Sequence, residues 1–342
     1  MAIDVSAGQP YAALIQSLEA VRSQPLWDRY HRITTRQPQS TATAHLWPWA
    51  TMEPLIDAAV RDVSMEDAER RVLLFSRPDR ADSVATLRSL SGGLQTLLPG
   101  EIARSHRHSL AALRFVMEGQ GAVTRVNGEP CLMEEGDLVL TPSLAWHEHT
   151  HPGKGRMVWF DGLDLPLLHH LDAMFFEPFS RDLEQVDPVA TRPCMAPWNH
   201  AVLAPDACEG GRRFRYGAQR AFKALEAAKP GTDGSRWLRY ADTSSNGPAL
   251  PTLDCYLASL ERGRPTTPGR STHSAICVVA SGAGQSTVGD AQFNWQRNDV
   301  FTVPHWQSVS HTAESDDARL FFMTDRELLA GMGYLREEET SL

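Results

Sequence analysis

Short apolar runs separated by turn residues fill the chain from about residue 94 onward. Two of these runs are joined by Asn127-Gly128, a dipeptide that favours a tight hairpin turn because both residues tolerate a positive φ. Short strands at regular spacing, each followed by a turn, are typical of a β-sandwich or β-barrel. We therefore predict strands at residues 113–117, 122–126, 131–133 and 138–141.

The same pattern recurs near the C-terminus, where short apolar runs again alternate with turns that contain glycine or aspartate. These runs are residues 276–280, 286–288, 293–296 and 300–303. The turn residues Gly121, Asp137 and Pro142 recur as Gly284, Asp299 and Pro304, at a shift of 162 or 163 residues. A near-constant shift is the mark of an internal repeat, so the sequence predicts two copies of one β-domain.

Helical patterns lie outside the two β-rich regions. Apolar residues at helical spacing predict helices at residues 11–22, 64–74 and 218–228. Ser64 followed by Asp67 resembles a capping box, whereas the segment 47–54, rich in tryptophan and proline, is expected to be irregular. The predicted organisation is a helical N-terminal segment 1–85, a first β-domain 86–175, a connector 176–245 and a second β-domain 246–342.

Composition narrows the class of partner. The chain has 342 residues and a formal net charge of -9, which argues against nucleic acid because such binding depends on clustered Lys and Arg. A small molecule or a protein is the expected partner. No run approaches the ~18 apolar residues of a membrane span. The cysteines are odd in number and form no CxxC pair, which favours reduced thiols in the cytoplasm. They are Cys131, Cys194, Cys208, Cys255 and Cys277.

Three histidines carry the clearest candidate chemistry. His106 and His108 are two residues apart, so on a strand both side chains project from one face. His147 lies just beyond the strand predicted at residues 138–141. A lone His-x-His pair is more often an ordinary surface or core pair, but the third histidine favours convergence on one metal ion.

The residues around these histidines resemble the two cupin motifs, which belong to a family that folds as a jelly-roll barrel with an internal metal. The stretches are Gly100-x5-His106-x-His108 and Gly136-Asp137-x4-Pro142-x4-His147. Cupins usually place a glutamate soon after the second histidine, where this chain has Ala112 and Leu113. The resemblance therefore implies a site of three neutral nitrogen ligands with open positions, which suits Fe(II).

Across most of its length the chain resembles bicupin gentisate and salicylate 1,2-dioxygenases, in which two jelly-roll β-barrels with helical additions make up one chain and chains form homotetramers. The resemblance lies in residues 69–73, 93–95, 99–101, 112–115, 146–149, 159–163, 238–240 and 247–251. It implies that Arg114 and Gln95 contact the substrate and that His149 accepts or returns a phenolic proton. Asp161 is expected to orient an imidazole, with Asp164 as a weaker candidate. The other expected pocket residues are Ser91, Gly93, Trp146 and one of Arg70 and Arg71, between which the sequence does not choose.

The chain departs from this family in two places. Relatives often carry an aromatic residue where this chain has Ser91, so the pocket is expected to differ and to admit another 5-substituted salicylate, such as 5-nitrosalicylate. Shifting the three histidines by the repeat offset gives Gly269, Ser271 and Val309. We therefore predict one metal per chain, with the second barrel serving structure or dimer formation.

The leading functional hypothesis is an Fe(II) dioxygenase that opens gentisate or a related salicylate between the carboxyl-bearing and hydroxyl-bearing carbons, with both oxygen atoms of O2 entering the product. One alternative is a cupin metal decarboxylase or isomerase, which the missing glutamate and the metal-free second barrel disfavour. The other is a non-enzymatic cupin that stores or senses a small molecule. An intact triad disfavours storage, and no basic helix-turn-helix segment supports a transcriptional sensor.

Overall fold

The computed structural model describes residues 9–77, 79, 83–179, 201–203, 214–242 and 247–340, so Cys194 and Cys208 lie outside the described part. The chain divides into two compact units, Met1–Gln39 and Ser40–Leu342. The first unit contains helices α1 (Gln9–Ala20) and α2 (Tyr30–Ile33), which confirms the first predicted helix. The loop between these helices contacts α1, because Trp27 Nε1 donates a hydrogen bond to the Tyr11 hydroxyl at 3.2 Å. None of the described helices is long and apolar enough to cross a membrane.

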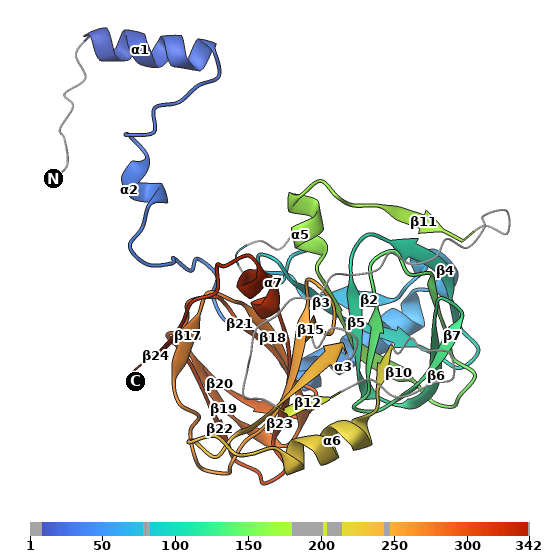
Figure 1. Ribbon diagram of the computed structural model, residues 1–342. Coiled ribbons are helices and arrows are strands. Elements are labelled where there is room, and N and C mark those ends of the chain that lie inside the picture. The colour runs from blue at the N-terminus through green and yellow to red at the C-terminus, as the bar shows by residue number, and fades with distance from the viewer. Residues whose placement is uncertain are drawn as a thin grey trace. The chain divides into compact units, whose positions relative to one another are not determined.

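The second unit consists of two β-barrels, each built from two sheets (Figure 1). In the first barrel the strand orders are β13-β8-β5-β10-β3-β2 and β11-β4-β9-β6-β7. Its strands are β2 (Val72–Leu74), β3 (Ser91–Leu97), β4 (Ile102–His108), β5 (Ala112–Glu118), β6 (Gln120–Val126), β7 (Glu129–Glu134), β8 (Leu138–Thr141), β9 (His147–Thr150), β10 (Met157–Leu163), β11 (Phe176–Pro178) and β13 (Arg215–Tyr216). The predicted Asn127-Gly128 hairpin turn joins β6 and β7, with φ values of 49° and 84°.

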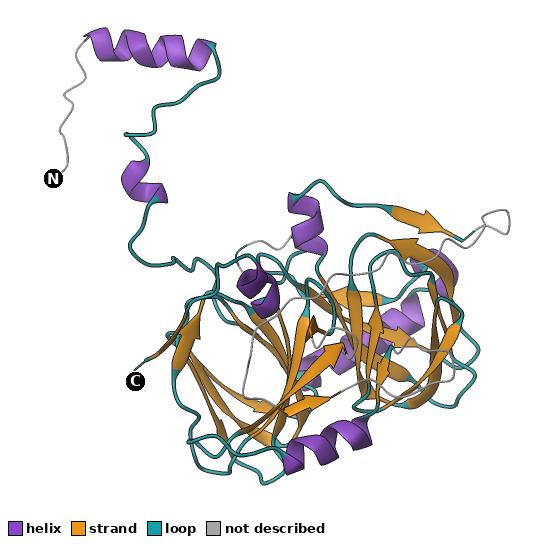
Figure 2. Ribbon diagram, in the orientation of Figure 1, coloured by secondary structure: helices purple, strands orange, loops and turns teal. Residues whose placement is uncertain are grey.

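The second barrel repeats this plan. Its strand orders are β1-β21-β18-β23-β16-β14-β12, with β15 beside β14, and β20-β19-β22-β17-β24. Its strands are β1 (Leu46–Trp47), β12 (Ala201–Leu203), β14 (Arg236–Asp242), β15 (Gly247–Pro248), β16 (Asp254–Ser259), β17 (Gly269–Ser271), β18 (Ala275–Ser281), β19 (Ala283–Val288), β20 (Ala291–Gln296), β21 (Val300–Val303), β22 (Val309–Ala313), β23 (Arg319–Thr324) and β24 (Glu337–Glu339). Strands dominate the body (Figure 2), and the predicted two-barrel fold is confirmed.

The two repeats exchange their first strands. Strand β1, at the start of the first repeat, pairs with β21 of the second barrel, and β13, at the start of the second repeat, pairs with β8 of the first barrel. A helix follows each exchanged strand, α3 (Trp49–Asp62) after β1 and α6 (Ala218–Ala227) after β13. The helix starts bind equivalent aspartates, because Trp49 N–H donates to Asp299 at 2.7 Å and Ala218 N–H donates to Asp137 at 2.9 Å.

This exchange changes the predicted organisation. Segment 47–54 is not irregular, because it forms the end of β1 and the start of α3, whose Met52 and Ile56 are buried one turn apart. The divide after Gln39 also differs from the expected boundary at residue 85. The described residues between 40 and 85 therefore belong to the second unit, where β1 and α3 correspond to β13 and α6 of the connector.

The helix predicted at residues 64–74 is only partly correct. Ser64 caps a single turn, α4 (Met65–Ala68), by accepting the Asp67 N–H at 3.1 Å. The chain then leaves the helix, and residues 72–74 form β2 at the edge of a sheet. Pairing with β3 outweighs the weak helical pattern of the sequence there. Two further helices, α5 (Leu165–His170) and α7 (Arg326–Gly331), follow the last long strand of each repeat.

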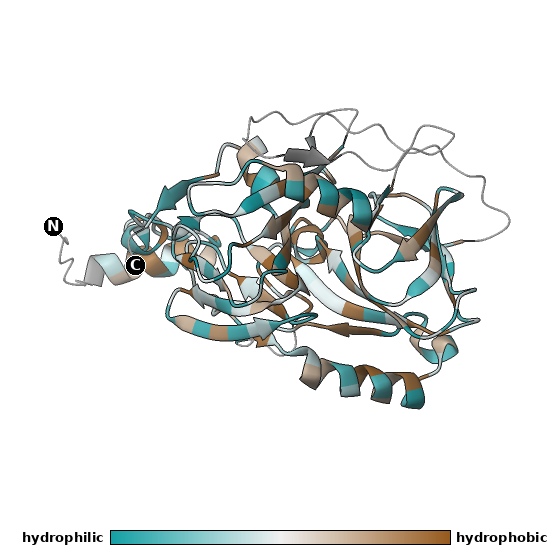
Figure 3. Cartoon of the chain, turned by 90° about the horizontal axis from the view of Figure 1, so that it is seen from below, coloured by the Kyte–Doolittle hydropathy of each residue, from teal (hydrophilic) through white to brown (hydrophobic). Residues whose placement is uncertain are grey.

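Three clusters of buried apolar side chains hold the body together. One lies between the barrels, where Phe115 stacks on Phe321 with ring centroids 4.3 Å apart. The other two fill the barrel interiors, around Trp159 in the first barrel and Phe301 in the second. Brown and teal segments alternate along several strands in Figure 3, as expected for strands with one apolar and one polar face. The central strands β5 and β10 are instead buried along almost their whole length, so both of their faces are covered.

Candidate active site

The three histidines of the first barrel meet inside it. His106 and His147 stand directly opposite each other on the paired strands β4 and β9, and His108 lies two residues along β4 on the same face. All three are buried, and their nearest ligand atoms lie within 4.8 Å of one another. The ring centroid of His147 is 4.1 Å from that of His106 and 4.7 Å from that of His108. The predicted convergence of three imidazoles is thus present in the structure.

Backbone carbonyls set the tautomer of all three imidazoles. Each Nδ1 lies 2.9–3.0 Å from the carbonyl oxygen of a nearby residue, and these residues are Arg104, Leu110 and Ala145. A carbonyl can only accept, so Nδ1 carries the proton and Nε2 keeps its lone pair. Burial lowers the pKa of His106 to about 3 and that of His108 to about 4. All three rings are therefore neutral at physiological pH, which is the form that binds metals.

The histidines fit a metal ion on a further ground. His147 Nε2 is buried and has no hydrogen-bond partner in the described part of the chain. Burying a polar atom without a partner is costly, so such an atom is normally satisfied by a ligand or water. Three neutral nitrogens, each held by its own backbone contact, suit a divalent transition metal such as iron, copper or zinc.

A buried ion pair lies on the other sheet of the same barrel. Arg114 on β5 and Asp161 on β10 are cross-strand neighbours, with Arg114 Nε 3.7 Å from Asp161 Oδ1. Arg114 Nη1 also donates to the Thr141 hydroxyl. Burial raises the pKa of Asp161, and the charges of Arg114 and Arg70 oppose that rise. Asp161 was expected to orient an imidazole, but carbonyls do that for the triad, and its described partner is Arg114.

Strand β3 carries three expected pocket residues, Ser91, Gly93 and Gln95, at alternate positions and therefore on one face of the sheet. Gly93 is paired with Asp161 and Gln95 with Trp159, so their side-chain positions face the barrel interior. Both amide atoms of Gln95 are buried without a hydrogen-bond partner in the described residues. Gly93 has a structural reason to be glycine, because a Cβ there would lie 2.8 Å from the Leu73 carbonyl oxygen. An amide with no partner is what a polar ligand would satisfy.

His149 projects into the barrel two residues after His147. It is 1% exposed, and its Nδ1 lies 2.8 Å from the Thr124 hydroxyl. Its Nε2 is buried and has no hydrogen-bond partner among the described residues. His149 is therefore a further buried imidazole beside the triad, with its ring centroid 5.9 Å from that of His147.

Of the two arginines expected at the pocket, the structure favours Arg70. Its guanidinium lies 5.5 Å from the centroid of the Phe176 ring, which in turn stacks on His106 at 5.3 Å. Its charge also lowers the pKa of His106. Arg71 instead forms an ion pair with Glu101, so its guanidinium already has a partner within the chain.

Ser91 and Trp146 have other contacts than those expected. The Ser91 hydroxyl donates to the Val84 carbonyl, which ties the start of β3 to the preceding loop. Trp146 packs under the Arg107 guanidinium at 4.9 Å and against Phe179 at 5.3 Å. Trp146 therefore packs beside His147 against Arg107 and Phe179, whereas Ser91 lies on the same face of β3 as Gly93 and Gln95.

Sequence reasoning missed three contacts of the site. Thr141 and Thr124 contact Arg114 and His149, and only their inward positions on predicted strands could have indicated them. Phe176 reaches the site because β11 pairs with β4, with Phe176 opposite His108. No local pattern in the sequence announces that pairing.

The second barrel keeps the frame of the site without its ligands. Gly269 and Val309 are paired on β17 and β22 as His106 and His147 are in the first barrel, and Ser271 follows on β17. The cross-strand pair in the place of Arg114 and Asp161 is Cys277 and Phe322. The metal-ligand cluster found among the described residues is the triad of the first barrel.

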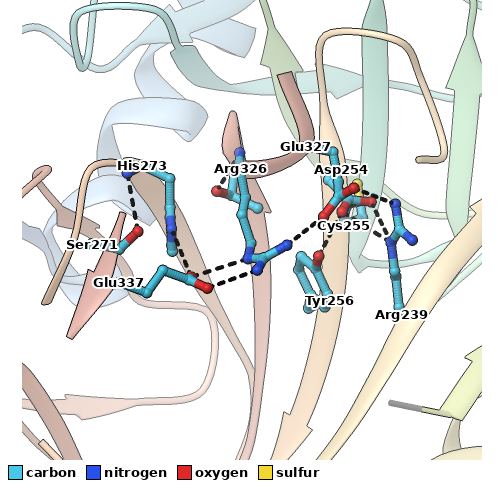
Figure 4. A network of polar contacts seen from close by, with 10 residues as sticks. Arg239, Asp254, Cys255, Tyr256, Ser271, His273, Arg326, Glu327 and Glu337 are labelled. Atoms are coloured by element: carbon cyan, nitrogen blue, oxygen red, sulfur yellow. Dashed lines mark hydrogen bonds and ion pairs between the residues drawn. The ribbon is translucent and has the colours of Figure 1, made fainter. Parts of the chain in front are cut away.

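Buried charges fill one end of the second barrel (Figure 4). Arg239 Nε donates to Asp254 at 3.0 Å, and Asp254 also accepts the Tyr256 hydroxyl at 2.6 Å. The ion pairs continue through Glu327 to Arg326. Burial raises the pKa of Asp254 to about 6 despite Arg239. These buried charges therefore pair with one another rather than staying isolated.

Comparison with known proteins identifies relatives along nearly the whole chain. The family model "Cupin domain" matches residues 93–163, which hold the triad. Gentisate 1,2 dioxygenase 1 of Aquipseudomonas alcaligenes is 35% identical over 94% of each chain. 5-Aminosalicylate 1,2-dioxygenase of Comamonas sp. is 33% identical over 95% of this chain and 89% of its own. A crystal structure of salicylate 1,2-dioxygenase from Pseudoaminobacter salicylatoxidans with gentisate has a TM-score of 0.86 and 28% identity, covering 100% of this chain and 97% of that one.

Proposed function

Because the chain belongs to the family of bicupin gentisate and salicylate 1,2-dioxygenases, which cleave aromatic rings, we propose that it opens an ortho-hydroxylated aromatic carboxylate. The bond broken joins the ring carbons that carry the carboxylate and the hydroxyl group. Both atoms of O2 enter the product, so no reductant is needed. The observation that carries this proposal is a barrel interior in which three neutral imidazoles from one sheet stand near a buried guanidinium from the other.

The metal in this proposal is Fe(II), held by Nε2 of His106, His108 and His147. Three neutral ligands leave coordination positions for a bidentate acid, and imidazole suits iron. When bound, Fe(II) supplies the redox chemistry that lets O2, with two unpaired electrons, react with a closed-shell ring. The chain itself then has to bind, orient and neutralise the substrate and to handle one proton.

Arg114 is the proposed clamp for the substrate carboxylate. Thr141 and Asp161 hold its guanidinium in place, so little side-chain freedom is lost when the substrate binds. A planar fork matches a carboxylate in two-point contact, which Lys could not reproduce. Arg70, beside His106 and Phe176, adds positive charge near the anionic oxygens.

His149 and Gln95 are the proposed polar contacts to the phenol. His149 Nε2 lacks a partner within the described residues, so it can accept the phenolic proton as the substrate binds and return it later. The Gln95 amide, also without a partner there, can hydrogen-bond the ring hydroxyl. Trp159 and Ser91 border this face, and we expect the space near Ser91 to select the ring's 5-substituent.

The proposed assembly is a homotetramer, as the family resemblance implied. Large apolar side chains of the first unit support association, since Val21, Trp27 and Ile33 are 72%, 56% and 63% exposed. Exposed apolar surface of this kind is typical of an interaction site. Buried thiols at Cys255 and Cys277, whose pKa burial raises, agree with the proposed cytoplasmic location.

The proposed reaction can be tested in two steps with the iron-loaded protein. Without oxygen, salicylate, gentisate and 5-nitrosalicylate should bind, whereas benzoate and phenol, which each lack one of the two groups, should bind far more weakly. Isotopically labelled O2 should then place two labelled atoms in a ring-opened product. His147→Ala is the matched inactive control.

Two outcomes would contradict the proposal. Release of CO2 with the ring intact would indicate the decarboxylase alternative. Tight binding of the acids without any turnover in the iron-loaded protein would indicate a non-enzymatic binding protein.

A further inference from the structure

A buried carboxylate links the catalytic barrel to the second barrel. Asp164 lies directly after β10 and is 2% exposed. Its Oδ1 accepts the Ala111 N–H at 2.8 Å, and its Oδ2 accepts the hydroxyl of Thr252, in the second repeat, at 2.5 Å. Although it stands at the start of α5, its side chain caps no helix N–H. Both described bonds of this carboxylate therefore hold other segments of the chain.

The segment held by Asp164 connects two residues of the proposed site. Leu110, next to Ala111, gives its carbonyl oxygen to His108 Nδ1 at 2.9 Å. Arg114 lies three residues after Ala111, as the third residue of strand β5. A displacement of Ala111 would thus carry with it the oxygen that orients His108.

The second repeat contains the same arrangement without the metal site. Asp325 accepts the Ser274 N–H at 2.7 Å and the hydroxyl of Ser89, which lies in the first repeat. Asp164 and Asp325 therefore form reciprocal bonds across the two barrels. The segment before Ser274 carries Ser271 where the first repeat has His108, so Asp325 positions no metal ligand.

We propose that Asp164 is a positioning residue for the metal site: by holding Ala111 against Thr252 it keeps the Leu110 carbonyl, and hence the His108 imidazole, in the orientation that binds metal. This inference rests on the proposed function only in assigning the triad to a metal. It gives the second barrel a role in the site, through one hydroxyl group. Arg114, on the same strand, is positioned by the same contact.

The test measures binding of Co(II) alone to the metal-free full-length chain, because histidine-bound Co(II) absorbs visible light and needs no substrate. Loss of a partner behind a metal ligand typically lowers affinity about 10- to 100-fold. We expect Asp164→Ala to lower the Co(II) affinity about 10-fold, at the smaller end of that range. Asp164→Asn, which can still bond Ala111 and Thr252, should stay close to the wild-type affinity.

Asp325→Ala is the matched control, since it removes an equivalent buried carboxylate that also joins the barrels. It should lower thermal stability without lowering Co(II) affinity. Thr252→Val removes only the bond from the second barrel, and a measurable fall in affinity is expected there too. This mild variant decides the matter if Asp164→Ala does not fold.

The inference is overturned if Asp164→Ala folds and binds Co(II) like the wild type, or if Asp325→Ala weakens binding to the same extent. It is also overturned if Asp164→Ala does not fold and Thr252→Val binds with wild-type affinity. Failure of ring opening in the wild type would refute the proposed function. The Co(II) affinities of the wild type and its variants would still decide whether Asp164 positions the metal site.

Discussion

Replacing Arg114 separates the two roles that the structure gives this side chain. It neutralises Asp161 inside the barrel and, in the proposed function, binds the substrate carboxylate. Arg114→Ala removes both roles at once. Arg114→Met combined with Asp161→Asn removes the pair of charges but leaves no uncompensated charge behind.

The expected magnitudes follow from the burial of the pair, in which Arg114 is 3% and Asp161 7% exposed. Breaking a buried ion pair from one side typically costs about 3–5 kcal/mol, whereas replacing both partners is often nearly neutral. Charge-assisted hydrogen bonds contribute about 1.5–3 kcal/mol, so the substrate should bind roughly 10- to 100-fold more weakly. The double variant should therefore recover stability but not substrate affinity.

Urea denaturation gives the free energy of unfolding, and calorimetry with the metal-loaded protein under nitrogen gives the affinity for salicylate. Both variants should keep the metal, because the triad does not involve Arg114. Recovery of substrate affinity in the double variant would refute the carboxylate clamp. An unchanged affinity in Arg114→Ala would show that the residue serves the structure alone.

Three further predictions concern other parts of the chain. Metal analysis should give one ion per chain, and His147→Ala should abolish binding; two ions per chain would show that the second barrel also holds a metal. Ser91→Tyr should change the ratio of the kcat/KM values for gentisate and 5-nitrosalicylate by an amount that corresponds to ~1–3 kcal/mol, the usual size of discrimination by pocket shape. An unchanged ratio would place Ser91 outside the pocket. Burial raises the pKa of Asp254 from 3.8 to about 6, so the folded protein binds this proton more tightly and the free energy of unfolding should fall as pH rises through that interval. Urea denaturation of the wild type below and above the interval measures this fall, and Asp254→Asn should lack it.

Much of the fold could be predicted from local patterns. The turn at Asn127-Gly128 and the strands around it are properties of short segments, since a positive φ and the alternation of side chains depend on a few neighbouring residues. The repeat offset placed Gly269 and Val309 correctly as the counterparts of His106 and His147. That prediction worked because equivalent residues keep equivalent partners in a repeated fold.

The secondary-structure predictions were wrong where contacts with residues distant in sequence outweigh the local pattern. Segment 47–54 contains two prolines that disfavour a helix, yet α3 forms because its start bonds Asp299 and its apolar face enters the core between the barrels. Residues 72–74 left the predicted helix because the edge of β3 was available to them. A local sequence pattern cannot indicate either contact, because Asp299 and β3 lie outside the short segments from which the predictions were made.

The sequence by itself determined the repeat, the barrel class and the identity of the triad, because strand alternation brings His106 and His108 to one face without outside help. Only the tertiary structure decided that Arg70 lies over the Phe176 ring while Arg71 pairs with Glu101, and that Asp161 pairs with Arg114. It also revealed that the barrels exchange their first strands and bond through Asp164 and Asp325. The physical reason is distance along the chain: such contacts join residues that have no fixed spacing in sequence and meet only after both barrels have closed.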